Sequence, residues 1–367
     1  MGLPAYNRGR KYGFLSKTLL PDGTEIPGTN FDYNYLQHRK VDVVSSALDF
    51  ILPFEKYKIT AGAKVSFTNT RNGINYDTSD PTLVQDDYFL TRSKSMPYML
   101  IIAVNFPNVF SMQLGLRMEH TRTTGISEAK DTEDKHDYTR LFPTVYLLYS
   151  PTDGHALNFS FSNRISRPSQ NMVNPFPFYQ NKYTYACGRE DLKPSYTYNA
   201  ELGYTLKNNF NVSAYYSYSD DVFFQVVDLD AETNVTSFLW ENFMKTHAFG
   251  LNNSYTFRTK WLQAYAQHGV SYRRTTSSAA TTSPEEKGWA YDASLRNTFF
   301  FNEKKTLLPR CPVPILPVQY QGIYLMSPTY SVSAGMLYRL LDNKLNLSLN
   351  VNNCLSAIPI GNMSNGL

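Results

Sequence analysis

The chain has 367 residues, of which 15% are aromatic, including 28 Tyr and 23 Phe, and only 18% are charged. This length is enough for one large domain, and the aromatic content excludes a disordered chain. The formal net charge of +4 is small, and Lys and Arg form no concentrated stripe, so we expect no nucleic-acid partner. Cys187, Cys311 and Cys354 lie far apart without Cys-x-x-Cys spacing, which argues against a zinc site and a disulfide framework.

Membrane-spanning helices are excluded because no run approaches the roughly 18 consecutive apolar residues that such a helix needs. A membrane location remains compatible with the sequence, since the strands of a transmembrane barrel alternate apolar and polar residues. The N-terminus carries Arg8, Arg10 and Lys11 but no apolar stretch and cleavage site of a secretory signal. We therefore expect either a soluble protein or part of a protein whose N-terminus lies further upstream.

Apolar residues recur with a period of two along most of the chain. The first clear run is Ile59, Ala61, Ala63, Val65 and Phe67, with polar or small residues between them. The same alternation returns in residues 112–118, 157–161, 200–206 and 345–351. This period predicts β-strands with one apolar and one polar face.

The connections between these strands alternate in length. Short polar links lie at residues 53–56, 106–108, 151–154, 207–209, 258–260, 302–305 and 342–344. Long polar or proline-bearing links lie at residues 71–92, 122–137, 167–196, 274–286 and 307–328. A soluble β-sandwich also has alternating strands, but the sorting by length favours an all-β, antiparallel, up-and-down transmembrane barrel with short periplasmic turns and long extracellular loops.

Counting the hairpins gives about 14 strands, an even number that such barrels permit. We expect residues 1–40 to be irregular or a strand remnant, residues 41–355 to form the barrel domain, and residues 356–367 to form a tail.

Between the strands at residues 157–161 and 200–206 lies a polar, proline-rich stretch with a distinctive motif. Its residues are Arg164, Arg167, Pro168, Asn174, Pro175, Gly188, Leu192 and Pro194, followed by Glu201 in the next strand. Together with Gly115-Leu116-Arg117-Met118-Glu119, Leu141-Phe142-Pro143 and Trp240-Glu241-Asn242, this stretch resembles the barrel domain of TonB-dependent outer-membrane receptors of the Bacteroidetes type.

The resemblance implies a nutrient receptor in the bacterial outer membrane, for a siderophore, a glycan or a similar ligand. It also implies a barrel of about 22 strands and a TonB complex that acts through a plug domain. No plug is recognisable in this chain. Residues 188–194 read Gly-Arg-Glu-Asp-Leu-Lys-Pro where the family has an Asn-Pro turn, and the C-terminus lacks a closing aromatic, so we expect a partial barrel.

Five aromatic residues follow the prolines in the same stretch: Phe176, Phe178, Tyr179, Tyr183 and Tyr185. They are candidates for a ligand-binding surface in an extracellular loop, because aromatic rings bind sugars and other rings. The alternative is a hydrophobic anchor that folds the loop into the barrel mouth. Pro168 and Pro175 end strand pairing and shape the loop in either case.

The charged residues of the motif also admit two interpretations. Arg164 and Arg167 could contact an anionic substrate group or lipopolysaccharide. Alternatively, Arg164 pairs inside the barrel with a carboxylate such as Glu201, since buried charges need partners. Residues 131–137 contain four acidic side chains that could bind Ca²⁺, but their spacing fits no EF-hand, and a solvated acidic loop is the favoured interpretation.

No catalytic, phosphate-binding or metal-binding motif is present, so we expect neither an enzyme nor a cofactor. The expected partners are outer-membrane lipid and lipopolysaccharide, an unidentified small nutrient, and TonB through a plug outside this chain. Three alternatives stay open: a smaller closed barrel acting as a passive porin or adhesin, a non-functional receptor remnant, and a soluble β-sandwich lectin.

Overall fold

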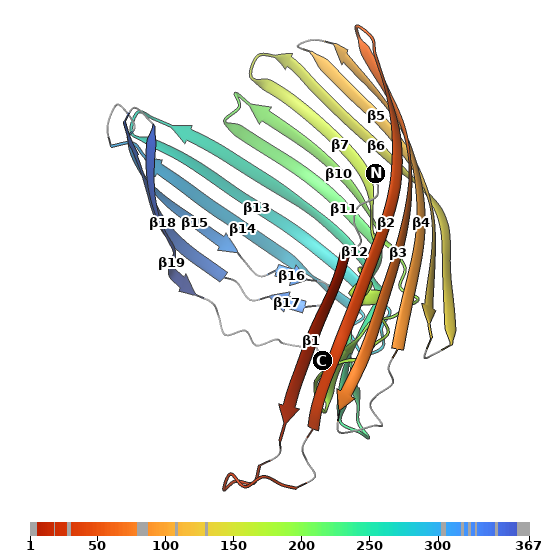
Figure 1. Ribbon diagram of the computed structural model, residues 1–367. Helices are drawn as coiled ribbons and strands as arrows, with labels where there is room; N and C mark the ends of the chain where they lie inside the picture. Colours follow the sequence, from red (N-terminus) through yellow and green to blue (C-terminus); the bar gives the residue numbers. More distant parts are fainter. Residues whose placement is uncertain are drawn as a thin grey trace.

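The computed structural model describes residues 6–17, 19–27, 31–78, 87–106, 109–128, 131–301, 306–316, 319–321, 324–326, 329–341 and 344–357. Figure 1 shows that long antiparallel strands form a single curved wall. In spatial order the wall consists of β1 (Tyr6–Ser16), β2 (Phe31–Pro53), β3 (Tyr57–Thr78), β4 (Asp87–Phe106), β5 (Phe110–Ser127), β6 (Thr132–Thr152), β7 (His155–Ser166), β10 (Ser195–Leu206), β11 (Phe210–Asp230), β12 (Val235–Arg258), β13 (Leu262–Ser277), β14 (Glu285–Phe299), β15 (Leu307–Leu316), β18 (Thr329–Leu340) and β19 (Leu345–Ala357).

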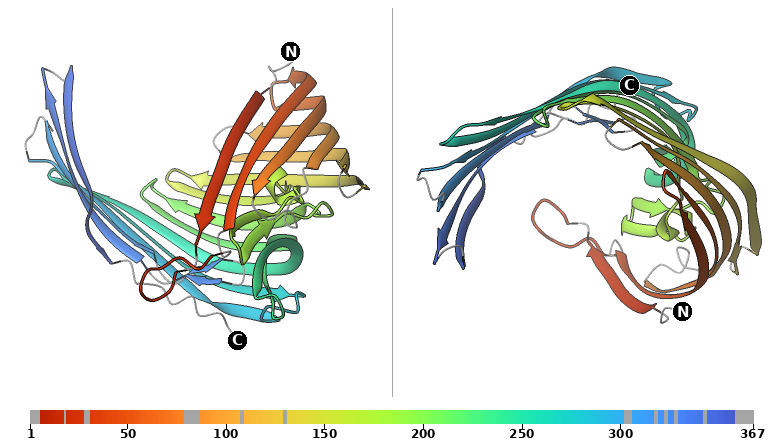
Figure 2. Two further views of the ribbon diagram at one scale, coloured as in Figure 1. Left: turned by 60° about the horizontal axis from the view of Figure 1, so that its bottom comes forward. Right: turned by 90° about the horizontal axis from the view of Figure 1, so that it is seen from above.

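Each strand of the wall pairs antiparallel with the next wall strand along the chain, which confirms the predicted up-and-down barrel topology. The sheet has 17 strands, which are the 15 strands of the wall together with the short β8 (Phe178–Asn181) and β9 (Thr184–Cys187). The wall itself has one strand more than the expected 14. Among the described residues, β1 pairs only with β2 and β19 only with β18. The wall is therefore open between β1 and β19, as the view along the barrel in Figure 2 shows.

Strand alternation places continuous apolar rows on the convex face of the wall. One row passes through the mutually paired residues Leu52, Ile59, Ile102, Leu114, Val145, Phe161, Ala200, Tyr216, Phe249, Tyr272 and Trp289. Cross-strand partners point to the same side of a sheet, so these side chains form a band around the wall. Exposing this band to water would cost about 25 cal/mol of free energy per Å² of apolar surface. Contact with the hydrocarbon tails of lipid avoids this cost.

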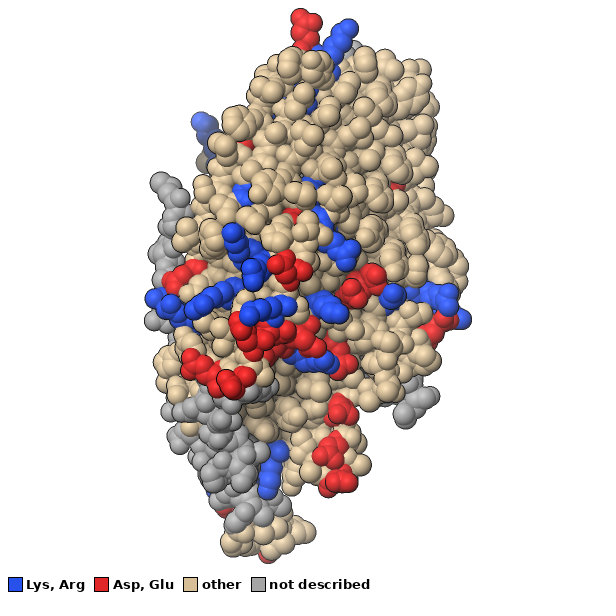
Figure 3. Space-filling model, turned by 90° about the vertical axis from the view of Figure 1, so that its right-hand side faces the viewer, with Lys and Arg blue, Asp and Glu red and all other residues tan. Residues whose placement is uncertain are grey.

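The band does not cover the whole height of the wall. Figure 3 views the outside of the wall over β3 to β6, and its upper part is almost free of charged side chains, whereas Lys, Arg, Asp and Glu gather lower down. The upper end carries the short turns, such as those joining β2 to β3 and β4 to β5. The strands therefore extend beyond the apolar band on the loop side.

Several predicted loops are strand in the structure. The predicted link 122–137 is a hairpin, because β5 continues to Ser127, β6 begins at Thr132, and Arg122 pairs with Asp137. Of the predicted link 71–92, β3 takes the residues up to Thr78 and β4 those from Asp87. Backbone pairing continues there without apolar alternation, because neither face needs to be apolar beyond the band.

The expected domain limits also differ from the strand limits. β1 and the first part of β2 lie within residues 1–40, so the expected start of the barrel at residue 41 falls inside a strand. β19 ends at Ala357, and most of the expected tail, residues 358–367, lies outside the described residues. In the part of the chain that the structure describes, no helix is long and apolar enough to cross a membrane.

Candidate functional site

The connection between β7 and β10 folds back against the concave face of the wall. It contains α1 (Gln170–Val173) and the β8–β9 hairpin, and Figure 2 shows the hairpin inside the curve of the strands. Its ends are tied together by backbone hydrogen bonds from Gly188 N to Asn174 O (2.9 Å) and from Arg189 N to Met172 O (2.9 Å). β9 also pairs with the start of β12. We call residues 167–194 the inner loop.

Aromatic side chains anchor the inner loop to the wall. Phe176 is 2% exposed and packs edge-on against Phe89 of β4, with ring centroids 6.4 Å apart. Phe178 packs against Tyr35 (5.8 Å) and Tyr179 against Tyr33 (4.9 Å), both on β2. These rings are thus occupied by the wall, as the anchor interpretation requires.

Two tyrosine hydroxyl groups complete the anchor. Tyr33 and Tyr76 both donate hydrogen bonds to the carbonyl oxygen of Pro177, at 3.2 and 3.3 Å. Of the five candidate aromatic residues, Tyr185 contacts Tyr179 at 5.4 Å, whereas Tyr183 is 54% exposed. Tyr183 is consequently the most exposed of the five.

An ion pair with a buried carboxylate fixes the start of the inner loop. Arg167 Nη2 donates to Oε1 of Glu119, a carboxylate on the concave face of β5 whose residue is only 5% exposed. Ser95 and Thr121 also donate hydroxyl hydrogen bonds to Glu119, at 3.1 and 3.3 Å. Arg117 lies 3.9 Å away from the same carboxylate. Since a buried charge without partners is costly, this carboxylate favours the docked loop.

The ion pair expected from the sequence is not the one that forms. Arg164 opposes Thr197 in the β7–β10 pairing, whereas Glu201 opposes Ser160. Both side chains share the concave face, but four residues of β10 separate their positions. No ion pair between them occurs among the described residues, and Arg167 takes the structural role that we expected of Arg164.

Side-chain bonds to β12 hold the Gly-Arg-Glu-Asp-Leu-Lys-Pro segment. Arg189 forms two hydrogen bonds with Asp191 (2.9 and 2.7 Å) and reaches Glu241 of β12 at 2.5 Å. Asn242 accepts from Lys193 N (2.8 Å) and donates to Lys193 O (2.9 Å). The Trp-Glu-Asn motif of β12 therefore binds the inner loop.

Electrostatics reinforce this segment. The hydrogen bond from Arg189, opposed by partial burial, lowers the pKa of the Asp191 carboxyl below its ordinary value, and the same bond raises the pKa of Arg189.

Gly188 is required at its position, because a Cβ there would lie 2.4 Å from Asn174 O and 2.5 Å from Met172 O. Leu192 (4% exposed) and Asn174 (0% exposed) are buried beside it.

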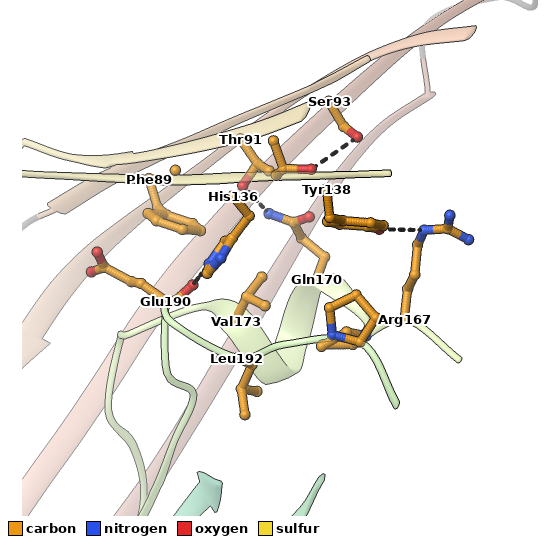
Figure 4. A pocket seen from close by; sticks show the side chains of 14 residues that line it. Phe89, Thr91, Ser93, His136, Tyr138, Arg167, Gln170, Val173, Glu190 and Leu192 are labelled. Atoms are coloured by element: carbon orange, nitrogen blue, oxygen red, sulfur yellow. Dashed lines mark hydrogen bonds between the residues drawn. The ribbon is translucent and has the colours of Figure 1, made fainter. Parts of the chain in front are cut away.

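A cavity of about 170 Å³ lies between the inner loop and the concave faces of β4, β5 and β6. Figure 4 shows the apolar side chains of Phe89, Val173 and Leu192 among polar ones, which include His136, Gln170 and Tyr138. Gln170 donates to Thr91 Oγ1 at 2.7 Å, and Arg167 Nε donates to the Tyr138 hydroxyl at 3.2 Å. Pro168 and Pro194 line its edge. The cavity thus offers apolar contact together with hydrogen-bond donors.

The cavity offers no metal-binding set. Among the described residues, no three His, Cys, Asp or Glu side chains lie close enough together to bind a metal ion. His136 approaches Asp134 at 3.4 Å and the carbonyl of Glu190 at 3.4 Å. The acidic residues considered for Ca²⁺ lie along β6 and its turn rather than in a loop.

The architecture identifies the class of protein. A single antiparallel wall with a lipid-compatible convex face is the wall of an outer-membrane barrel. Residues 4–357 match the outer membrane protein beta-barrel family. The chain belongs to this family, which places it in the bacterial outer membrane. No curated protein sequence matches the chain.

Solved structures with the same fold are receptors and transporters. A copper transporter is 12% identical with a TM-score of 0.65, covering 96% of this chain and 60% of its own. The ferric yersiniabactin uptake receptor of Yersinia pestis is 14% identical with a TM-score of 0.57, covering 95% and 53%. The ferripyoverdine receptor of the outer membrane of Pseudomonas aeruginosa is 16% identical with a TM-score of 0.53, covering 95% and 49%.

At these identities the likeness shows the fold, and it confirms the resemblance to TonB-dependent receptor barrels at that level. The chain spans about half the length of the solved receptors that it matches.

Proposed function

We propose that this chain forms the wall and the inner loop of an outer-membrane receptor that binds a small nutrient at the loop end of the barrel. The observation that carries the proposal is the docked inner loop. Arg167, Phe176 and Asn242 contacts fix it against three different regions of the wall, and a cavity remains between loop and wall.

The chemistry of the cavity suggests the kind of ligand. Phe89 and Leu192 supply apolar contact, while Arg167, Tyr138 and Gln170 carry hydrogen-bond donors. The volume of about 170 Å³ is smaller than that of a typical ligand pocket, so this combination suits one part of a ligand that carries both apolar and acceptor groups, such as a metal-chelating siderophore or a glycan. The ferripyoverdine receptor and the ferric yersiniabactin uptake receptor among the solved structures are in line with the first of these.

The transport step rests on the resemblance to the receptor family. In that proposal, TonB acts on a plug domain outside this chain, and the wall described here supplies ligand contacts. The exposed Tyr183, at the tip between β8 and β9, would make the first aromatic contact with an arriving ligand.

Growth experiments test the proposal. A strain lacking the full-length gene should fail to grow on one defined iron or glycan source and recover with the wild-type gene. Genes carrying Gln170→Ala or Tyr138→Phe should need about 10-fold more of that nutrient, the cost of one or two lost hydrogen bonds. Tyr265→Phe, a substitution on β13 outside the cavity, serves as control.

Two outcomes contradict the proposal. One is that deletion impairs growth on no iron or glycan source. The other is that the purified protein gives a steady, ligand-independent conductance in planar bilayers, since that result supports the porin alternative.

A further inference from the structure

A basic groove lies on the convex face of the wall, away from the inner loop. Its cations are Arg92 and Lys94 on β4 and Arg122 on β5, all three exposed. Lys94 pairs directly with Arg122 across the strands, and Arg92 lies two residues along β4. Val44 and Phe67 line the groove, which has a volume of about 420 Å³.

The positive charge of this groove is largely uncompensated. Among the described residues, none of Arg92, Lys94 and Arg122 forms an ion pair. Lys94 lies over the ring of Phe67, with Nζ 5.5 Å from its centroid. Asp137, which pairs with Arg122 in register, has its charge contact with His120 at 3.6 Å.

Carboxylates near the groove are outnumbered by cations. Asp42 lines the groove itself, and Glu133 lies on the next convex row. The flanking positions of the convex face add the exposed Lys40 and Arg71, whereas Lys135 and Glu133 neutralise each other in an ion pair of 2.9 Å. Like charges at such short separations repel one another, so an anion bound here would stabilise the arrangement.

The position of the groove relative to the apolar band identifies the anion. The last apolar row of the band on this side passes through Leu48, Ala63, Tyr98, Met118 and Leu141. Lys94 lies four residues from Tyr98 along β4, which is about 13 Å at the rise of a β-strand. Figure 3 shows the same step from an uncharged upper surface to a charged belt on this face.

The belt lies on the side of the long connections, which is extracellular in outer-membrane barrels. The groove is therefore level with the headgroups of the outer leaflet and faces lipid rather than the barrel interior. We propose that Arg92, Lys94 and Arg122 bind the phosphate groups of an anionic lipid of the outer leaflet, with Val44 and Phe67 contacting the apolar part of that lipid. Two guanidinium groups and an ammonium group provide the bidentate and point-charge contacts that phosphate prefers.

This proposal is independent of the nutrient that the receptor binds. It gives the lipid partner expected from the sequence a defined site on β4 and β5. It also explains why cations occur in the convex rows at this height, where the corresponding rows of the band are apolar.

Lipid titration of the purified full chain in a zwitterionic detergent tests the site. The probe is lipid A with two phosphate groups, and binding is followed by native mass spectrometry. The triple variant Arg92→Gln, Lys94→Gln and Arg122→Gln should lose about 100-fold in affinity, at roughly fivefold for each cation near a charged lipid surface. The wild-type affinity should fall with added salt.

Matched variants separate a site from a general charge effect. Lys56→Gln, Arg258→Gln and Lys260→Gln together remove the same charge from the short-turn rim and should leave lipid A affinity within about twofold, since exposed charges more than about 10 Å away are screened. The Arg92→Lys and Arg122→Lys double variant should retain most of the binding. Wild-type-like heat modifiability on gels should show that each variant is folded.

Several results would overturn the proposal. Equal loss in the short-turn variant would assign lipid binding to overall charge. Unchanged binding in the groove variant would exclude these residues. Displacement of lipid A by equimolar inorganic phosphate would mean that the groove binds free phosphate rather than lipid, and preferential binding of a soluble acidic peptide would assign it to a protein partner.

Discussion

The ion pair between Glu119 and Arg167 should control how firmly the inner loop is docked. The informative substitution is Arg167→Gln, because it leaves the 5% exposed Glu119 without its main partner. Removing one member of a fully buried ion pair costs about 3–5 kcal/mol. Here Ser95, Thr121 and the more distant Arg117 still serve the carboxylate, so we expect a cost of about 2 kcal/mol.

A change of about 2 kcal/mol corresponds to about 30-fold in the undocking equilibrium. Hydrogen exchange in detergent micelles measures it at the amides of Gly188 and Arg189, whose hydrogen bonds to Asn174 and Met172 exist only in the folded loop. These amides should exchange about 30-fold faster in Arg167→Gln.

The opposite substitution gives the sharper test. Glu119→Gln removes the buried charge and leaves Arg167, whose side chain is 40% exposed and can be hydrated. Its effect should therefore be smaller, about fivefold in exchange. Arg164→Gln, on the same face without an ion pair among the described residues, should have no effect on these amides. If Glu119→Gln accelerated exchange as much as Arg167→Gln, the burial argument would be refuted.

Four further predictions follow from single contacts. Gly188→Ala should release the inner loop to proteases, because its Cβ would meet Asn174 O at 2.4 Å, whereas Gly73→Ala, with its nearest atom at 3.6 Å, should not. Asn242→Ala should raise hydrogen exchange at Lys193 about 10-fold through loss of the bond to Lys193 N. The protection factor of the Arg189 amide should stay constant between pH 8 and 5, where the Arg189–Asp191 bond is fully formed, and should decrease as pH falls through the lowered pKa of Asp191, since a depressed carboxyl pKa stabilises only above the unfolded value. Leu114→Lys should impair folding into lipid vesicles by about 2–4 kcal/mol, unlike Gln113→Lys on the concave face.

The wall was predictable because its rule is local. Residues such as Leu114 and Leu116 face lipid while Gln113 and Arg117 face the interior, and that period of two is visible in the sequence alone. Beyond the apolar band the alternation of apolar and polar residues disappears from the sequence. Thr121, Thr123 and Gly125 continue β5 in the same pairing, but both faces there are polar, so the sequence reads as a loop.

The site was predictable only in outline. The motif residues located the inner loop, and its aromatic residues allowed either an anchor or a ligand surface. Their partners could not be chosen from sequence, because Tyr33 and Tyr35 lie more than a hundred residues away in the segment expected to be a remnant. Glu119 lies 48 residues from Arg167, whereas the nearer Glu201 looked equally suitable until the strand register placed it opposite Ser160.

The central claim is that one face of the wall meets lipid and the other the barrel interior, where the inner loop docks. Cysteine scanning along residues 112–118 of β5 tests it most directly, in a background with Cys187, Cys311 and Cys354 replaced by Ser, in native outer membranes. We predict that a water-soluble maleimide labels cysteines at positions 113, 115 and 117 and leaves those at 112, 114, 116 and 118 unlabelled. Uniform labelling, or labelling without a period of two, would contradict the account.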